Sequence, residues 1–211
     1  MSAKILDSVG ARLDPAHSAV LVIDMQNDFC AKDGYVETVV GKDVSACRAV
    51  VKPIMDLVGN ARKAAVPVFW IKANYDADKI PVGMLAKQRE RSTAICCGSG
   101  SWGGEFFEVA PQPGEAVIEK HCYSAFRGTD LDTRLRALSI RTVVLAGVQT
   151  NVCVETSLRD AVCVGFHAVI AADCVASHTP PLHEATLANT RFLFGDVLNR
   201  AEIAAHWRKA T

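Results

Sequence analysis

Three residues of different chemical type follow three short apolar runs of the chain. Asp24 comes directly after one run, Lys120 follows a second, and Cys153 lies shortly after a third. If these runs are parallel strands, their carboxyl ends meet at one edge of a sheet, where ligands bind in open α/β folds. A carboxylate can take the proton of a nearby thiol, and an ammonium stabilises the negative charge that develops. The spacing therefore predicts Cys153 as a nucleophile, with Asp24 as its base and Lys120 as its electrostatic partner.

Each of these residues also has an ordinary structural explanation. Cysteines are often small buried hydrophobes, aspartates cap turns, and lysines at strand ends are commonly solvated. Cys153 is expected in the first turn of a helix, where free N–H groups and the helix dipole favour a thiolate. His121 adjoins Lys120, but successive side chains of an extended segment point in opposite directions. The convergence of three groups on one predicted edge favours catalysis over three separate structural roles.

Strand-like and helix-like patterns alternate along the sequence. Short β-branched runs predict buried strands, and apolar residues at helical spacing, bounded by capping residues, Pro or Gly, predict helices. This alternation predicts an α/β fold, with a mostly parallel central sheet and helices on both faces, as one domain over residues 1–211. The predicted strands are 19–23, 68–71, 115–118, 142–146 and 166–171, and the predicted helices are 50–65, 130–138, 151–164 and 179–194.

The composition excludes several classes of function. Lysine and arginine together number 23, as do aspartate and glutamate, so the formal net charge is zero. A neutral chain lacks the basic surface that binds nucleic acids or membrane headgroups. No uncharged apolar run reaches the roughly 18 residues that suggest a membrane-spanning helix. The expected partners are a small molecule and further copies of the chain.

Eight cysteines are present, and their context argues against a disulfide scaffold. The sequence begins Met-Ser-Ala-Lys without an apolar leader, and Cys163 and Cys174 flank an apolar run as small core hydrophobes would. These features predict free thiols and a cytoplasmic location. A thiol oxidoreductase is not favoured, because the chain has no CxxC and the adjacent Cys96 and Cys97 cannot easily bridge.

A long irregular stretch, residues 74–113, contains the glycine-rich run 96–104. Loops of this length in compact domains usually form lids, binding sites or interfaces. The glycines fit neither GxGxxG between a strand and a helix nor GxxxxGK followed by Ser or Thr. Nucleotide binding is therefore not expected.

The sequence resembles the isochorismatase-like cysteine hydrolase family over nearly its whole length. The most specific motif reads Ala-Gly-Val-Gln-Thr-Asn-Val-Cys-Val-Glu, with the predicted nucleophile as its cysteine. The resemblance rests on the motif at 22–29, the lysine after the third strand, the motif at 146–155, the pair 159–160 and Asp173.

This resemblance implies roles for particular residues. Asp24, Lys120 and Cys153 correspond to the catalytic triad of the family. The backbone N–H groups of Gln149 and Cys153 correspond to its oxyanion hole. A non-proline cis peptide is implied between Val148 and Gln149.

Further positions in the sequence indicate which branch of the family it resembles. Nicotinamidases have a metal site with two histidines after the second strand, whereas the corresponding residues 72–79 contain none. His178 and His183 have no obvious third ligand, so neither a metal nor another cofactor is expected. True isochorismatases cleave a vinyl ether without this cysteine. Ureidoacrylate amidohydrolase, biuret hydrolase and N-carbamoylsarcosine amidohydrolase are similar at residues 34–35, 100–102, 111–114 and 120–126.

The resemblance thus implies a metal-independent cysteine amidohydrolase. Such an enzyme uses water to cleave a C–N bond of a small ureido, carbamoyl or amide compound through a thioester. A nicotinamidase-type amidase and a non-catalytic binding member of the family are the alternatives. Because family members often assemble, a homodimer or homotetramer is expected, with the long loop at the interface.

Loop placement and the resemblance together predict the residues that contact the substrate. Arg127 differs from the aromatic residue expected in ureidoacrylate enzymes. Its guanidinium either clamps a carboxylate or carbonyl oxygen or is a solvated surface group. The predicted substrate-binding residues are Phe29, Asn74, Trp102, Tyr123, Phe126 and Arg127.

Overall fold

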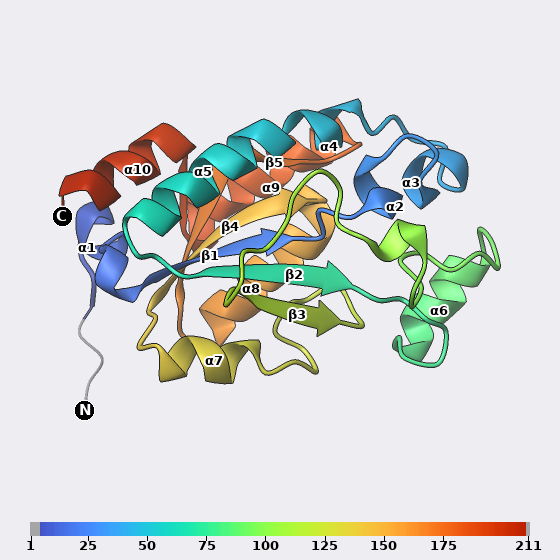
Figure 1. Cartoon of the computed structure of the whole chain (residues 1–211), viewed down its shortest axis with the longest axis horizontal. Helices are drawn as coiled ribbons and strands as arrows, with labels where there is room; N and C mark the ends of the chain where they lie inside the picture. Colours follow the sequence, from blue (N-terminus) through green and yellow to red (C-terminus); the bar gives the residue numbers. More distant parts are fainter. Residues whose placement is uncertain (1–4, 210–211) are drawn as a thin grey trace.

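The structure is a computed structural model that describes residues 5–209. Its centre is a six-stranded sheet in the order β3-β2-β1-β4-β5-β6, and all neighbouring strands are parallel. Figure 1 shows the strands running in one direction between two layers of helices. The predicted α/β fold with a parallel central sheet is therefore confirmed. The strands are β1 (Ser18–Ile23), β2 (Val68–Ala73), β3 (Ala116–Lys120), β4 (Thr142–Val148), β5 (His167–Ala176) and β6 (Asp196–Leu198).

Two apolar cores lie on opposite faces of the sheet. Residues of β1 alternate between them, because successive side chains of a strand point to opposite faces. Helices α5 (Val51–Lys63) and α10 (Arg200–Lys209) cover one face and contribute Ile54, Leu57, Ile203 and Trp207. The other face is covered by α7 (Leu131–Ala137), α8 (Glu155–Cys163) and α9 (Pro180–Asn189).

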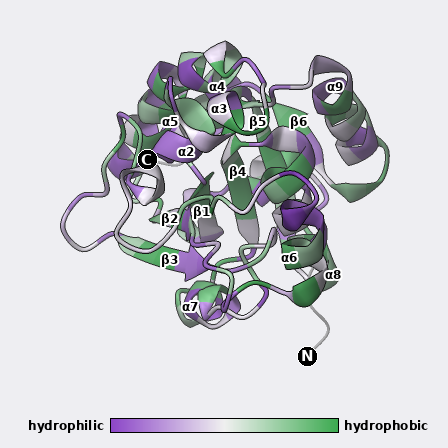
Figure 2. Ribbon diagram, turned by 90° about the vertical axis from the view of Figure 1, so that its right-hand side faces the viewer, coloured by the Kyte–Doolittle hydropathy of each residue, from purple (hydrophilic) through white to green (hydrophobic). Residues whose placement is uncertain are grey.

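Shorter elements gather at the carboxyl edge of the sheet, the edge that Figure 2 presents to the viewer. They connect the strands that carry the predicted catalytic residues. The short helices near this edge are α2 (Asn27–Cys30), α3 (Tyr35–Thr38), α4 (Ser45–Ala49) and α6 (Val82–Arg89), with a 3-10 turn, η2 (Trp102–Gly104). The remaining elements, α1 (Val9–Arg12) and η1 (Pro15–His17), precede β1.

The structure differs from the sequence-based expectations in several places. The helix expected at 151–164 begins as a π-turn, η3 (Thr150–Val154), and the last long helix ends in another, η4 (Thr190–Phe194). Strand β6 and helix α10 were not expected. Residues 74–113, expected to be irregular, include α6. Cys174 is buried as expected, but the same expectation for Cys163 is wrong, because this residue is exposed near the end of α8.

No helix among residues 5–209 is both long enough and apolar enough to cross a membrane.

Candidate active site

The predicted catalytic residues lie where the order of the strands reverses direction along the chain. Asp24 directly follows β1, and Cys153 follows its neighbour β4, on the two sides of this switch point. Lys120 is the last residue of β3, two strands away from β1. In doubly wound sheets, the crevice at the carboxyl ends of the strands around such a point binds ligands.

A glycine lets the two central strands approach at this point. Gly147 in β4 has a φ of +111°, and a Cβ there would lie 2.0 Å from the carbonyl oxygen of Ile23. Any larger side chain would push β1 and β4 apart. Asp24 itself has a φ of +53°, which is uncommon for a residue other than glycine. The backbone at the reversal is therefore tightly constrained just before both catalytic positions.

Gln26 fixes the loop that leaves β1. Its side-chain oxygen accepts a hydrogen bond from the N–H of Ala73 at 2.7 Å. Its side-chain nitrogen donates to the carbonyl oxygens of Ala73 and Gly104, each at 2.9 Å. This buried amide joins the ends of β1 and β2 to the long loop and so holds Asp24 in place.

The three predicted catalytic side chains are in mutual contact. The Nζ of Lys120 lies 2.9 Å from Oδ2 of Asp24 and 3.4 Å from Sγ of Cys153. The side chains of Lys120 and Asp24 are 0% and 1% exposed, so water does not screen their attraction. The negative charge of Asp24 also acts on Cys153, because it raises the pKa of the thiol. A carboxylate, an ammonium and a thiol thus lie together in a part of the protein that is shielded from solvent.

Tyr75 belongs to this cluster, although the sequence did not single it out. Its hydroxyl oxygen accepts a hydrogen bond from Lys120 at 2.9 Å and lies 3.5 Å from the sulfur of Cys153. Lys120 donates as well to the carbonyl oxygen of Cys122 at 3.0 Å. The only sequence signal for this role is that Tyr75 lies just beyond the end of β2, two positions after Ala73.

The carboxylate of Asp24 retains acceptor capacity despite its burial. Among the described residues, no side chain or backbone group meets its oxygens with hydrogen-bond geometry, and the Lys120 contact is an ion pair. Burial raises the pKa of Asp24, while the charge of Lys120 opposes that rise. A buried carboxylate of this kind can accept an N–H group of a substrate or the proton of the thiol.

Lys120 carries a stable positive charge. Burial opposes the charged form, but the pKa of its ammonium is nevertheless raised because Asp24 and Cys153 interact with it. An ammonium has three N–H donors, and four acceptors surround this one: Asp24, Tyr75, Cys153 and the carbonyl oxygen of Cys122. The protein therefore provides enough acceptors for all three N–H donors of this ammonium.

The sulfur of Cys153 is a neutral thiol at rest. Burial raises its pKa to about 12, the negative charge of Asp24 adds to the rise, and Lys120 and Tyr75 oppose it. The thiolate expected from the helix terminus is thus not the resting form, because desolvation outweighs the cationic neighbour. Asp24 is the buried carboxylate that acts on this thiol.

The π-turn that carries Cys153 leaves backbone N–H groups available. In η3 the N–H groups of Val152 and Val154 pair with the carbonyl oxygen of Gln149. The first N–H groups of a helical turn have no partner within it, and Cys153 lies among them. The peptide bond between Val148 and Gln149 is cis.

The side chain of Gln149 is anchored behind the turn. Its Oε1 accepts a hydrogen bond from the N–H of His178 at 3.0 Å, and its amide contacts the thiol of Cys47. Gln149 is 6% exposed and lines the cavity described next. This anchoring fixes the backbone just before the predicted nucleophile, Cys153.

A cavity of about 450 Å³ lies beside the cluster, although Asp24, Lys120 and Cys153 are not themselves among the residues that line it. Its wall includes Tyr75, Gln149 and Val152, which adjoin Cys153, and it extends to α3, α6 and the start of α9. A larger hollow of about 630 Å³ lies near Val68 and Ala116, at the amino ends of β2 and β3. Ligands bind at the carboxyl ends of parallel strands, so the smaller cavity is the candidate substrate site.

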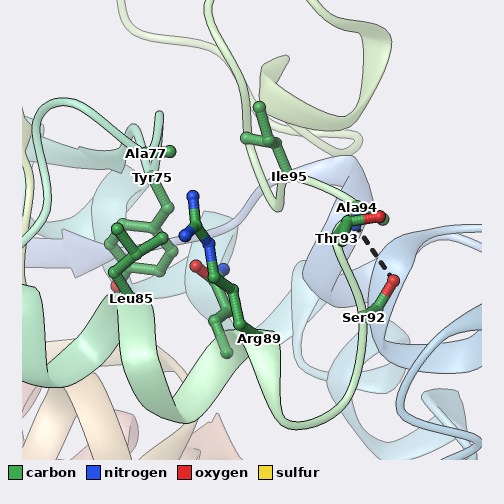
Figure 3. Close-up of a pocket in the computed structure, with 9 residues that line it drawn as sticks. Tyr75, Ala77, Leu85, Arg89, Ser92, Thr93, Ala94 and Ile95 are labelled. Atoms are coloured by element: carbon green, nitrogen blue, oxygen red, sulfur yellow. Dashed lines mark hydrogen bonds between the residues drawn. The ribbon is translucent and has the colours of Figure 1, made fainter.

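A further hollow of about 260 Å³ adjoins the candidate site on the side of α6 (Figure 3). Tyr75 and Gln88 border both spaces. Figure 3 shows the ring of Tyr75 beside Leu85, with Arg89 extending into the hollow opposite Ile95. The ring of Tyr75 therefore separates this hollow from the buried cluster.

Two of the predicted substrate-binding residues line the candidate site. Phe29 is 8% exposed and packs edge-on against the ring of Tyr75, with centroids 6.4 Å apart. Tyr123 is 39% exposed and also lines the cavity. Both can contact a substrate placed against Cys153.

Asn74 and Trp102 have other contacts. The side-chain nitrogen of Asn74 donates to Ser99 and Glu119, each at 3.0 Å, so this residue ties the long loop to β3. Trp102 is 56% exposed, and its carbonyl oxygen accepts a hydrogen bond from Asn27. Neither residue lines the cavity.

Phe126 and Arg127 also lie outside the cavity wall. Phe126 packs into the core on the α7–α8 face, where its ring is 5.9 Å from that of Phe166. Arg127 forms a two-pronged ion pair with Asp160, with both N–O distances 2.9 Å, and its side chain is 68% exposed. The position of Arg127 agrees with a solvated surface role and not with a clamp on the substrate, because its guanidinium is already paired with Asp160.

Potential metal ligands occur together in one place within residues 5–209. The carboxylate of Asp28 and the thiols of Cys96 and Cys97 lie within 4.8 Å of one another. His178 and His183 do not belong to this group, and their rings contact Thr179 and Thr150, respectively. The group shares no residue with the Asp24–Lys120–Cys153 cluster.

A three-layer α/β fold with a buried thiol, carboxylate and ammonium at its switch point is consistent with a class of α/β hydrolases. Residues 18–202 match the isochorismatase domain family, and the chain belongs to this family. The protein is a hydrolase, and the names of its relatives agree with an enzyme that acts on C–N bonds of linear amides.

The chain is similar in sequence to an amidohydrolase and in structure to a cysteine hydrolase and an amidase. The chain is 33% identical over 207 residues to ureidoacrylate amidohydrolase from Methylorubrum extorquens, covering 91% of this chain and 83% of the relative. A cysteine hydrolase from Pseudomonas syringae has a similar structure, with a TM-score of 0.86, 27% identity and full coverage of both chains. N-carbamoylsarcosine amidase from Thermoplasma acidophilum has a TM-score of 0.72 and 27% identity, covering 87% of this chain and 96% of that one.

Proposed function

We propose that the protein hydrolyses a C–N bond of a small ureido or carbamoyl compound through a thioester on Cys153. The observation that carries the proposal is the buried contact of Lys120 with both Asp24 and Cys153 beside a 450 Å³ cavity. The names of the relatives, ureidoacrylate amidohydrolase and N-carbamoylsarcosine amidase, support a ureido or carbamoyl group as the reacting part.

In the first step, Asp24 takes the proton of the Cys153 thiol as the sulfur attacks the carbonyl carbon. A new C–S bond forms, and the electron pair of the C=O bond moves to the oxygen. As the family resemblance implies, the backbone N–H groups of Gln149 and Cys153 donate to this oxyanion. One such donor commonly contributes about 2.7–4 kcal/mol to transition-state stabilisation.

In the second step, the C–N bond breaks and the protonated Asp24 gives its proton to the departing nitrogen. For a terminal ureido group, the leaving molecule is ammonia, and the remainder stays on the sulfur as a thioester. Water then attacks the thioester with Asp24 again acting as base, and the C–S bond breaks to restore the thiol. Each proton taken by Asp24 is returned within the same half-reaction.

Lys120 and Tyr75 stabilise these charges in a site that is shielded from bulk solvent. While the proton resides on Asp24, the negative charge lies on the sulfur or the oxyanion, and the ammonium 3.4 Å from the sulfur compensates for it. The Tyr75 hydroxyl contacts both Lys120 and Cys153, and this contact opposes the rise of the thiol pKa. Electrostatic groups already in place need not reorganise during the reaction.

The charge of the cavity favours an anionic substrate. Lys42, Lys87 and Arg91 line it, and no acidic residue is among the described residues of its wall. Lys87 pairs with Glu90, just outside the wall. Burial raises the pKa of Tyr123, and the positive charge of Arg91 opposes that rise, so Arg91 acts electrostatically on the interior. A ureido compound that carries a carboxylate fits this arrangement.

The decisive experiment combines a substrate screen with detection of the intermediate. Ammonia release is measured from ureidoacrylate, biuret, triuret, N-carbamoyl amino acids and nicotinamide, with the wild type and Cys153→Ser in parallel. We expect turnover of an anionic ureido compound by the wild type only, and a mass adduct on Cys153 in rapidly quenched samples. Full activity of Cys153→Ser would exclude a covalent thiol mechanism, and turnover of nicotinamide alone would favour a nicotinamidase-type enzyme.

A further inference from the structure

We propose that Asp28, Cys96 and Cys97 form a binding site for a soft divalent cation of the Zn²⁺ type in the wall of the substrate cavity. Their ligand atoms lie within 4.8 Å of one another, one carboxylate oxygen and two sulfurs. Thiolates and carboxylates are ordinary zinc ligands, and three protein ligands leave one position of a tetrahedral site open.

The spacing of the two sulfurs fits this coordination. Sγ of Cys96 lies 3.8 Å from Sγ of Cys97. Two sulfurs bound to one zinc at about 2.3 Å with a tetrahedral angle are about 3.8 Å apart. The same spacing is far beyond the roughly 2.05 Å of a disulfide, so these thiols are arranged as a pair of ligands and not as a bridge.

The carboxylate is already held in position. Oδ2 of Asp28 accepts a hydrogen bond from the N–H of Cys97 at 2.6 Å, and Oδ1 accepts one from Tyr35 at 3.1 Å. A Cβ at Gly103 would lie 2.2 Å from Oδ2, so only glycine leaves room for the carboxylate. A carboxylate offers about four lone-pair sites, and two remain for a cation.

The chemistry of binding is an exchange of protons for the metal. Binding forms two S–Zn bonds and one O–Zn bond, and each thiol releases its proton to the solvent, with no oxidant required.

The position of the site links it to turnover. Cys96 is among the residues that line the cavity, together with Tyr75 and Gln149 from the vicinity of Cys153. A cation on its sulfur therefore borders the space for the substrate, and its open coordination position is available to a ligand there. Occupancy should inhibit the enzyme reversibly, which is a role separate from the hydrolytic reaction.

The test uses the reduced full chain carrying Cys153→Ser, which removes the nucleophilic thiol as a competing ligand. Co²⁺ is titrated as a coloured substitute for Zn²⁺, and the thiolate-to-cobalt absorption band is recorded. We expect one bound ion with a thiolate band, displaced by Zn²⁺. Adding Cys97→Ser or Cys96→Ser should shrink the band and weaken binding by roughly tenfold or more. Cys163→Ser, which changes an exposed thiol, is the matched control and should leave both unchanged.

A second measurement needs no change at the proposed ligands. The Cys153→Ser protein is treated with an alkylating reagent with and without Zn²⁺, and modified cysteines are mapped by mass spectrometry. Zn²⁺ should protect Cys96 and Cys97 together and leave Cys163 reactive. Absence of a thiolate band in the parent, or alkylation of either Cys96 or Cys97 at the same rate with Zn²⁺ present, overturns the proposal.

Discussion

The hydroxyl oxygen of Tyr75 lies 3.5 Å from the sulfur of Cys153. The same hydroxyl accepts a hydrogen bond from Lys120, so a tyrosine of the β2 loop connects the cation and the thiol. Its contact opposes the burial that raises the pKa of Cys153. This relationship makes Tyr75 a testable positioning residue for the proposed nucleophile.

Tyr75→Phe should therefore slow the reaction of Cys153. A hydrogen bond to a charged group contributes about 1.5–3 kcal/mol, so we expect kcat to fall by roughly ten- to a hundredfold. The pH at which iodoacetamide alkylates Cys153 should move upward, because the thiolate loses a stabilising contact. Tyr35→Phe, which changes another tyrosine of the cavity wall, is the control and should keep the alkylation profile of the wild type.

Asp24→Asn should be nearly inactive and less stable. The change removes the proposed base and leaves the ammonium of Lys120, whose side chain is 0% exposed, without its counter-ion. Removing one partner of a buried ion pair commonly costs about 3–5 kcal/mol. Urea denaturation measures this loss, with Asp132→Asn as control, since its pair with Arg136 is 41–54% exposed. A fully active Asp24→Asn enzyme would remove Asp24 from the mechanism.

The free energy of unfolding should fall as the pH rises above about 9. The Cys153 thiol has an ordinary pKa of 9.0 and a folded-state pKa of about 12. Between these values the folded protein retains a proton that the unfolded chain has lost, so stability is full below 9 and decreases toward 12. One such thiol contributes about 1.4 kcal/mol per pH unit.

Cys153→Ser should therefore have a shallower decline of stability between pH 9 and 10.5 in urea titrations. Part of the decline should persist, because burial also raises the pKa of Cys47 to about 11. Cys163→Ser, which changes an exposed thiol, should follow the wild-type curve. Identical slopes for Cys153→Ser and the wild type would contradict a neutral resting thiol.

Arg91→Gln should discriminate between anionic and neutral substrates. Because Arg91 lines the cavity, its loss should lower kcat/KM for a carboxylate-bearing ureido compound by about tenfold or more. A neutral compound such as biuret should be affected far less. Arg89→Gln is the matched control, because Arg89 lines the neighbouring hollow instead of the candidate site (Figure 3). Equal losses for both substrates would argue against charge recognition by Arg91.

A strong chelator should leave the rate of hydrolysis undiminished. The proposed reaction moves protons through Asp24 and requires no Lewis acid. A chelator can remove only the inhibitory cation proposed at Cys96 and Cys97, so activity should stay constant or rise. Activity measured before and after chelation, and again after restoring Zn²⁺, checks this. A reversible loss of activity on chelation would contradict the metal-independent mechanism.

Much of the architecture was predictable because buried parallel strands have a strong sequence signal. Their apolar, β-branched runs identified β1 to β5, and the residues just after these runs identified Asp24, Lys120 and Cys153. The three-residue strand β6 has too short a pattern to stand out. The π-turn of η3 was also missed, because a π-turn and an α-helical turn have the same apolar pattern.

The remaining site residues depend on how loops are folded. Phe126 and Arg127 are neighbours in sequence, yet one packs in the core and the other pairs with Asp160. Tyr75 joins the triad because Gln26 holds the ends of β1 and β2 together. No local sequence pattern determines where the side chains of these loop residues lie.

The sequence by itself determined the parallel sheet and the three reactive residues at its carboxyl edge. The reason is that strand periodicity and strand ends are local properties. The tertiary structure alone decided the neutral state of the thiol, the place of Tyr75 and the position of Asp28 beside Cys96 and Cys97. Desolvation and contacts between distant segments control these features, and both exist only once the chain is packed.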